Sequence, residues 1–113
     1  MARVIVVKSL EEKINRKFKK ESIEIFELMF SLRESPKKGK VVGQIGGIVI
    51  KELKYKSHRF YFIVDGYKIK VFDVEELSDI LIKFVRMSDK KDQQKVIDEI
   101  KVVLRKFGEE GLG

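Results

Sequence analysis

The middle of the chain alternates apolar and polar residues in short runs, as expected for β-strands that are buried on one face. The runs cover residues 48–55, 58–64, 67–74 and 80–87. Asp65-Gly66 stands between the second and third runs and is a dipeptide favoured in two-residue β-hairpins. Lys56-Ser57 separates the first two runs and gives a weaker turn signal. The pattern therefore predicts antiparallel strands joined by tight turns.

Helical spacing of apolar residues flanks this region on both sides. A buried strand at residues 3–7 leads into a helical segment, with Ser9 and Glu12 spaced as a capping box. This segment is one long helix, or two helices broken near Lys20, and it ends before Pro36. Ser88 or Asp89 caps a final helix that Gly108 ends. The glycine-rich residues 41–47 favour either a strand start with a bulge or a close approach of the backbone.

The order of these segments predicts a single α+β domain over residues 1–113. We expect an N-terminal helix or helical pair to pack on a twisted, mainly antiparallel sheet of about four to five strands, followed by a C-terminal helix. A chain of 113 residues is long enough for one hydrophobic core.

Alternation also separates the two faces of the sheet. Phe60, Phe62 and Val64 lie on one face, which we interpret as the core face. The opposite face is predicted to carry polar side chains from three strands: Glu52, Lys54, Arg59, Tyr61, Lys68 and Lys70. We therefore expect replacement of Phe62 by alanine to destabilise the domain strongly and replacement of Tyr61 by alanine to cost little.

The charge of the chain suggests a use for this polar face. Lys and Arg number 25 against 18 Asp and Glu, a formal net charge of +7, which favours a polyanionic partner: nucleic acid, an anionic membrane or an acidic protein. Arg and Lys bind phosphates, Tyr stacks on unpaired bases, and a carboxylate can accept a proton from a sugar hydroxyl. The alternative is an ordinary solvated sheet face on a protein that happens to be basic.

The remaining composition narrows the chemistry. The chain has no cysteine and one histidine, so neither a thiolate site nor a histidine cluster can hold a metal, and we predict no metal or cofactor. No apolar run reaches the length of a signal peptide or membrane helix, which predicts a cytoplasmic protein without membrane contact. A single asparagine with abundant Lys, Glu and Ile favours a thermophilic source.

Four short motifs in order give the chain a family resemblance. They are Pro36 with Gly39-Lys40, Glu52-Leu53-Lys54, the strand segment 59–62, and residues 84–91, where a last strand enters a helix. This arrangement resembles the RelE/ParE toxin superfamily, and most closely its HigB-like, phage-derived branch. The resemblance implies helices packed on a mainly antiparallel sheet, ribosome-dependent mRNA cleavage, and inhibition by a cognate antitoxin.

The resemblance also implies roles for individual residues. Arg59 matches the strand arginine that contacts the scissile phosphate, and Glu52 with Lys54 matches the charged pair on the preceding strand. The basic end of the last strand is matched by Lys83, Arg86 and Lys90. An RNA 2′-hydroxyl would attack its own phosphate, with Glu52 or Lys54 as base and with Arg59 and Arg86 or Lys83 stabilising the charge.

Two further functions remain open from the sequence. The same fold could serve as a non-catalytic module that binds nucleic acid or protein, and ParE-like relatives instead inhibit DNA gyrase. The long, charged C-terminal helix departs from the family pattern and could cover part of the site. Such a covering would favour the non-catalytic alternative.

Overall fold

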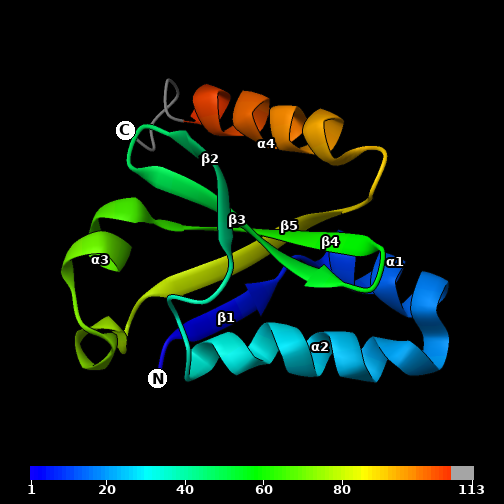
Figure 1. Ribbon diagram of the computed structural model, residues 1–113, viewed down its shortest axis with the longest axis horizontal. Coiled ribbons are helices and arrows are strands. Elements are labelled where there is room, and N and C mark those ends of the chain that lie inside the picture. The colour runs from blue at the N-terminus through cyan, green and yellow to red at the C-terminus, as the bar shows by residue number, and fades with distance from the viewer. Residues whose placement is uncertain (108–113) are drawn as a thin grey trace.

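The computed structural model describes residues 1–107 and contains one five-stranded sheet (Figure 1). The strands lie in the order β1-β5-β4-β3-β2. Only β1 runs parallel to its neighbour β5, and the other strand pairs are antiparallel. Their bounds are β1 (Arg3–Val6), β2 (Lys40–Ile45), β3 (Ile48–Tyr55), β4 (His58–Asp65) and β5 (Leu81–Asp89).

Helices cover both faces of this sheet. Helices α1 (Lys8–Phe18) and α2 (Ser22–Phe30) pack on one face, and α4 (Gln93–Phe107) packs on the other, as Figure 1 shows. The short helix α3 (Gly66–Val71) and a 3₁₀ turn (Val74–Leu77) connect β4 to β5. The predicted α+β class, the N-terminal helical pair and the C-terminal helix are therefore confirmed. Within the described range, no helix is long and apolar enough to cross a membrane.

The N-terminal helical segment is broken near Lys20, which was one of its two predicted arrangements. Lys19 has a left-handed φ of 52°, and a 3₁₀ turn at Lys19–Glu21 separates α1 from α2. The capping box predicted at Ser9 is wrong, because α1 already begins at Lys8 with Val7 in the N-cap position. The Val7 amide still donates to the Phe84 carbonyl of β5, so strand pairing continues until the helix starts.

The hairpin predicted at Asp65-Gly66 is also wrong. The Asp65 carboxylate accepts a hydrogen bond from the Lys68 amide at 3.0 Å and caps α3, while the Gly66 amide donates to the Gly47 carbonyl. Aspartate serves equally well in a turn and at a helix N-cap, so the dipeptide did not decide between them. Residues 67–74 form no strand, and β4 pairs with β5 instead.

The turn predicted at Lys56-Ser57 is confirmed, and it sets the register of the β3–β4 hairpin. Leu53 pairs with Phe60 and Glu52 pairs with Tyr61, and Lys56 in the turn has a φ of 54°. Phe60, Phe62 and Val64 are buried against the N-terminal helices as predicted. The opposite face is also buried in part, because α4 places Ile97, Ile100 and Leu104 over Ile50 and Tyr61.

Buried Lys51 interrupts the apolar face beneath the N-terminal helices. Lys51 is 2% exposed, and its ammonium group donates a hydrogen bond to the Lys37 carbonyl at 2.8 Å. Burial lowers the pKa of Lys51. Gly39, with φ 106°, lies so close to the Phe62 ring that a Cβ would stand 2.7 Å from its Cζ. These contacts hold the basic loop at residues 35–39 against the sheet.

Helix α4 starts later than the sequence indicated. Strand β5 continues to Asp89, whose carboxylate accepts hydrogen bonds from the Lys91 and Asp92 amides just before the helix. The predicted capping residue therefore orders the turn that precedes α4. The end predicted at Gly108 lies outside the described residues.

Candidate RNA-contacting site

Strand pairing brings the candidate catalytic residues together on the α4 side of the sheet. Glu52 of β3 pairs with Tyr61 of β4, and Tyr61 pairs with Arg86 of β5. Arg59 pairs with Lys54 on one side and with Ser88 on the other. The side chains of Glu52, Arg59, Tyr61 and Ser88 form what we call the polar cluster.

Most of this cluster is buried, and α4 packs over its Tyr61. Tyr61 is fully buried, Arg59 is 8% exposed and Glu52 is 9% exposed. The Tyr61 and Ser88 hydroxyls lie 2.8 Å apart and share a hydrogen bond. Burial raises the pKa of Tyr61. The expectation that Tyr61 is an exposed stacking platform is therefore wrong for this conformation, since its ring lies in the core formed with α4.

The charged pair in the cluster is incompletely satisfied. Arg59 Nε lies 3.9 Å from Glu52 Oε2, which is too long for a hydrogen bond. Within residues 1–107, Arg59 Nη1 and Glu52 Oε2 are buried without a hydrogen-bond partner. Buried charged groups normally have partners, and leaving them without one costs free energy. The cluster therefore retains unused donor and acceptor capacity.

Exposed cations border the buried cluster. Lys54 is exposed on β3 beside Arg59, and Arg86 is exposed on β5 beside Tyr61. A register shift between β4 and β5 inserts Val85, and the Arg86 guanidinium donates to the Val85 carbonyl. Lys54 and Arg86 therefore remain available to phosphates while Arg59 and Glu52 are covered.

The other predicted RNA-binding lysines do not pair with any residue of the polar cluster. Lys68 and Lys70 are exposed on α3, because the strand predicted there is a helix. Lys83 is exposed near the start of β5, and Lys90 is exposed in the turn before α4. The structure thus brings together five of the nine predicted site residues. They are Arg59, Glu52, Lys54, Tyr61 and Arg86.

Two residues with clear roles were missed by the sequence interpretation. Ser88 was assigned to a helix cap, although its position two residues after Arg86 on a strand places it beside Arg59. Lys51 received no role, although alternation along β3 places it on the same face as Leu53. Alternation along β5 was the available signal for Ser88, once the strand is known to reach Asp89.

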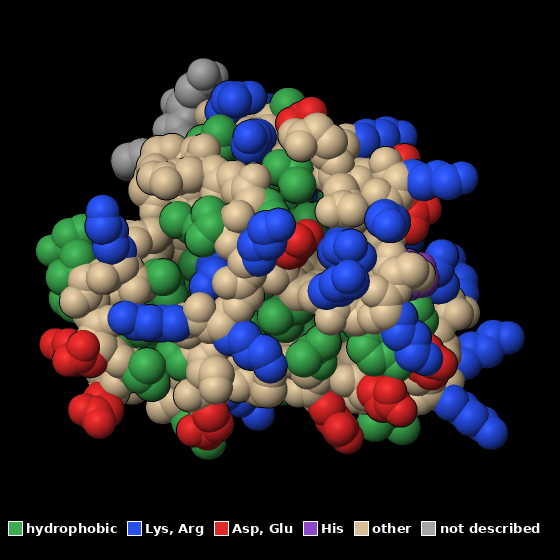
Figure 2. Space-filling model, viewed as in Figure 1, with side chains coloured by type: hydrophobic (Ala, Val, Ile, Leu, Met, Phe, Trp, Pro, Cys, Tyr) green, Lys and Arg blue, Asp and Glu red, His purple; other side chains and the backbone are tan. Residues whose placement is uncertain are grey.

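Basic side chains dominate one view of the surface. Figure 2 shows Lys and Arg gathered across the middle and right of the face on which β2 and the β3–β4 hairpin lie, while Asp and Glu lie mainly along its lower edge. This uneven distribution creates a surface suited to a polyanion.

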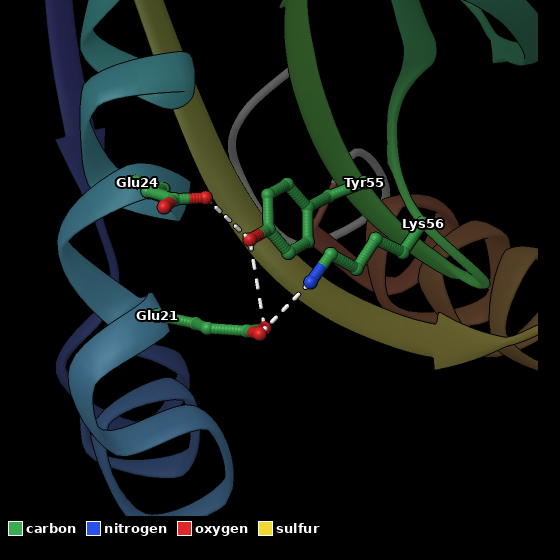
Figure 3. A network of polar contacts seen from close by, with 4 residues as sticks. All are labelled: Glu21, Glu24, Tyr55 and Lys56. Atoms are coloured by element: carbon green, nitrogen blue, oxygen red, sulfur yellow. Dashed lines mark hydrogen bonds and ion pairs between the residues drawn. The ribbon is translucent and has the colours of Figure 1, made fainter.

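A polar network anchors the tip of the β3–β4 hairpin to the N-terminal helices (Figure 3). The Tyr55 hydroxyl donates to Glu24 at 2.8 Å, and the Lys56 ammonium pairs with Glu21 at 2.8 Å. The hydrogen bond to Lys56 lowers the pKa of Glu21, and the hydrogen bond to Glu24 raises the pKa of Tyr55. The network fixes the hairpin end that carries Lys54 and Arg59.

His58 lies at the start of β4, next to Arg59, and is partly buried against the ring of Phe18, with ring centroids 4.9 Å apart. Burial, with a contribution from Lys17, lowers the pKa of His58. The histidine therefore packs as a partly exposed structural residue. Residues 1–107 contain no group of three His, Asp or Glu side chains able to hold a metal ion.

Comparisons with protein families, with curated proteins and with solved structures found no match to this chain.

Proposed function

We propose that this protein is the toxin component of a toxin–antitoxin pair and cleaves mRNA on the ribosome. The observation that carries the proposal is the register that brings Glu52, Arg59 and Arg86 onto one face of adjacent strands. These are the residue types and positions that the RelE/ParE resemblance implies, and the α+β fold is the one that it implies. The partners would be mRNA on the ribosome and a cognate antitoxin protein.

The proposed reaction uses only side chains and the RNA itself. The 2′-oxygen attacks the adjacent phosphorus, and the bond from phosphorus to the 5′-oxygen of the next nucleotide breaks. Glu52 accepts the proton of the 2′-hydroxyl, and water supplies the proton that the departing 5′-oxygen takes up. Arg59 and Arg86 stabilise the negative charge that grows on the phosphoryl oxygens. The products are a 2′,3′-cyclic phosphate and a free 5′-hydroxyl.

Burial of the cluster adds a condition to this proposal. With Arg59 and Glu52 less than a tenth exposed, a phosphate can reach them only after the polar cluster opens, and we take movement of α4, which packs over Tyr61 on the same face, to be that opening. Lys54 and Arg86 can bind the RNA backbone before that movement, because both are exposed. We therefore place RNA binding first and exposure of the cluster second.

The same burial favours a second candidate function. If α4 stays in place, the exposed cations alone could make the protein a non-catalytic RNA-binding module. Lys54, Arg86 and Lys83 would then contact phosphates without any chemistry following. The two candidates differ in whether α4 must move.

A covalent restraint on α4 tests the proposal. A Cβ built on Gly43 of β2 would lie 2.9 Å from Lys101 Cε of α4, so cysteines at these positions can be joined by a short bismaleimide. The chain has no cysteine of its own, so the linkage is unique. Cleavage of a translated message is then mapped by primer extension in a purified translation system.

The toxin proposal predicts cuts by the wild type and by the unlinked double-cysteine variant, and loss of cutting after cross-linking. Equal cutting by the cross-linked protein would place the catalytic site elsewhere. RNA binding without cutting by any form would leave the binding module as the function.

A further inference from the structure

An apolar groove runs beside α4 on the sheet face that the helix leaves open. It is a hollow of about 370 Å³ with aliphatic side chains from β4, β5 and α4 along its lining, joined by Phe107 at its end. The apolar side chains of its lining include Val7, Ile63, Val85, Val103, Leu104 and Phe107. Val103 is 39% exposed and Phe107 is 52% exposed, so part of this apolar lining faces solvent.

The charges of the groove have one sign. Lys83 and Arg86 line it, and no carboxylate does so within residues 1–107. A second hollow of about 890 Å³ shares Ile63, Lys83 and Leu104 with the groove and extends it towards Lys68 and Arg105, where Asp65 and Asp79 also lie. The groove beside Val85 and Val103 is therefore an apolar surface with cations along it.

We propose that this groove binds an amphipathic acidic segment of a partner protein. Apolar side chains of that segment would cover Val85, Val103 and Phe107, and its carboxylates would pair with Lys83 and Arg86. Its identification as part of an antitoxin rests on the proposed function, whereas the preference of the groove for an acidic amphipathic segment does not.

Two other occupants fit less well. RNA bases bind by stacking on flat rings, and the groove offers aliphatic side chains with Phe107 as its only ring among the described lining residues. A second copy of this chain would bring a net charge of +7 against Lys83 and Arg86, so electrostatic repulsion opposes dimerisation through this face.

Neighbouring valines on α4 provide a matched pair of variants. Val103 lines the groove, whereas Val102 is 61% exposed and does not line it. Val103→Glu and Val102→Glu add the same charge at adjacent exposed positions of one helix. A difference between them therefore reports on the groove and not on net charge or helix propensity.

The probe is a phage-displayed library of random peptides selected against the purified full chain, with the winning peptides resynthesised for affinity measurement. We expect acidic amphipathic peptides whose affinity falls about tenfold or more with Val103→Glu, because the change places a carboxylate against theirs. Val102→Glu should alter affinity by less than about twofold, as surface changes usually do. Lys83→Glu should weaken binding in the same direction as Val103→Glu.

Several results would overturn the proposal. Failure to select any peptide, selection of peptides without acidic character, or equal effects of the two valine variants would each do so. Sedimentation that shows a dimer of the wild type dissociated by Val103→Glu would assign the groove to a second copy. Single-stranded RNA binding lost with Val103→Glu but kept with Val102→Glu would assign it to RNA. None of these measurements depends on cleavage, so loss of the nuclease hypothesis would leave the groove testable.

Discussion

Replacement of Tyr61 by alanine should destabilise the protein about as much as replacement of a core phenylalanine. The Tyr61 ring is fully buried between the sheet and α4, in contact with the cluster that contains Ile97, Ile100 and Leu104. The truncation removes this packing and leaves a cavity beneath the helix. It also removes the partner of the Ser88 hydroxyl, which is itself buried.

The size of the effect follows from these two losses. Truncation of a buried aromatic side chain costs about 3–5 kcal/mol. Tyr61→Phe keeps the ring and removes only the hydroxyl, and leaving Ser88 without its partner should cost about 1–3 kcal/mol. For a domain of this size, each kcal/mol lowers the melting temperature by roughly 4 °C. Tyr61→Ala should therefore melt about 12–20 °C below the wild type.

Urea unfolding and thermal melting of four proteins check this prediction. The wild type, Tyr61→Ala and Tyr61→Phe are compared with Tyr67→Ala, whose side chain is 65% exposed and serves as the matched control. The control should lie within about 0.5 kcal/mol of the wild type. A Tyr61→Ala protein as stable as the Tyr67→Ala control would refute the assignment of Tyr61 to the core beneath α4.

Two further predictions concern charge. Burial lowers the pKa of Lys51 in the folded protein, so between that value and the unfolded value of about 10.4 the unfolded chain binds more protons and stability rises with pH. Urea titrations should therefore show the wild type gaining stability relative to Lys51→Met as the pH rises from about 7 to about 10, and a constant difference would argue against a buried ammonium. RNA binding should weaken steeply with salt. The double variant Lys54→Gln/Arg86→Gln should make the negative slope of log K, the association constant, against log[salt] shallower by roughly 1.4 for single-stranded RNA. Filter binding across a salt series measures that slope, and an unchanged value would exclude these two cations from the phosphate contacts.

Alternation correctly predicted β3, β4 and β5 and the faces of the β3–β4 hairpin, although it wrongly added a strand at residues 67–74. Both follow from local geometry, because a register with Lys56-Ser57 in the turn determines which residues face each other. A break near Lys20 was one of the two arrangements that the apolar spacing allowed. These features depend on residues close to one another along the chain.

What covers the second face of the sheet could not be settled from alternation. An amphipathic face carrying Arg59 and Tyr61 is compatible with solvent, with a ligand or with another helix. Ile50 and Ile63 on that face, together with the apolar stripe of α4, were the signals for helix packing. They specify a long-range contact, which a local pattern does not encode.

The Asp65-Gly66 error has a different origin. Both a turn and a helix N-cap need a side chain that accepts a backbone hydrogen bond, and Asp65 meets that need in either case. Strand pairing selects the N-cap, because β5 pairs with β4 and leaves residues 67–74 without a place in the sheet. Lys68 and Lys70 therefore lie on α3 and not on the predicted strand.

The measurement that tests the central claim most directly is mRNA cleavage by a protein whose buried charged pair has been neutralised. Arg59→Ala alone is a poor variant, because it leaves the buried Glu52 carboxylate without its nearest cation and can cost about 3–5 kcal/mol of stability. The double variant Glu52→Gln/Arg59→Gln removes both charges, and Arg59→Lys keeps the charge but loses the planar guanidinium. Melting curves establish that each variant is folded before activity is compared.

Primer extension on translated messages then gives the cleavage rate of each folded variant. The account predicts that the wild type cuts, that Glu52→Gln/Arg59→Gln cuts at least about 10²-fold more slowly, and that Arg59→Lys lies between them. A folded double variant that cuts as fast as the wild type would contradict the assignment of this cluster as the catalytic site.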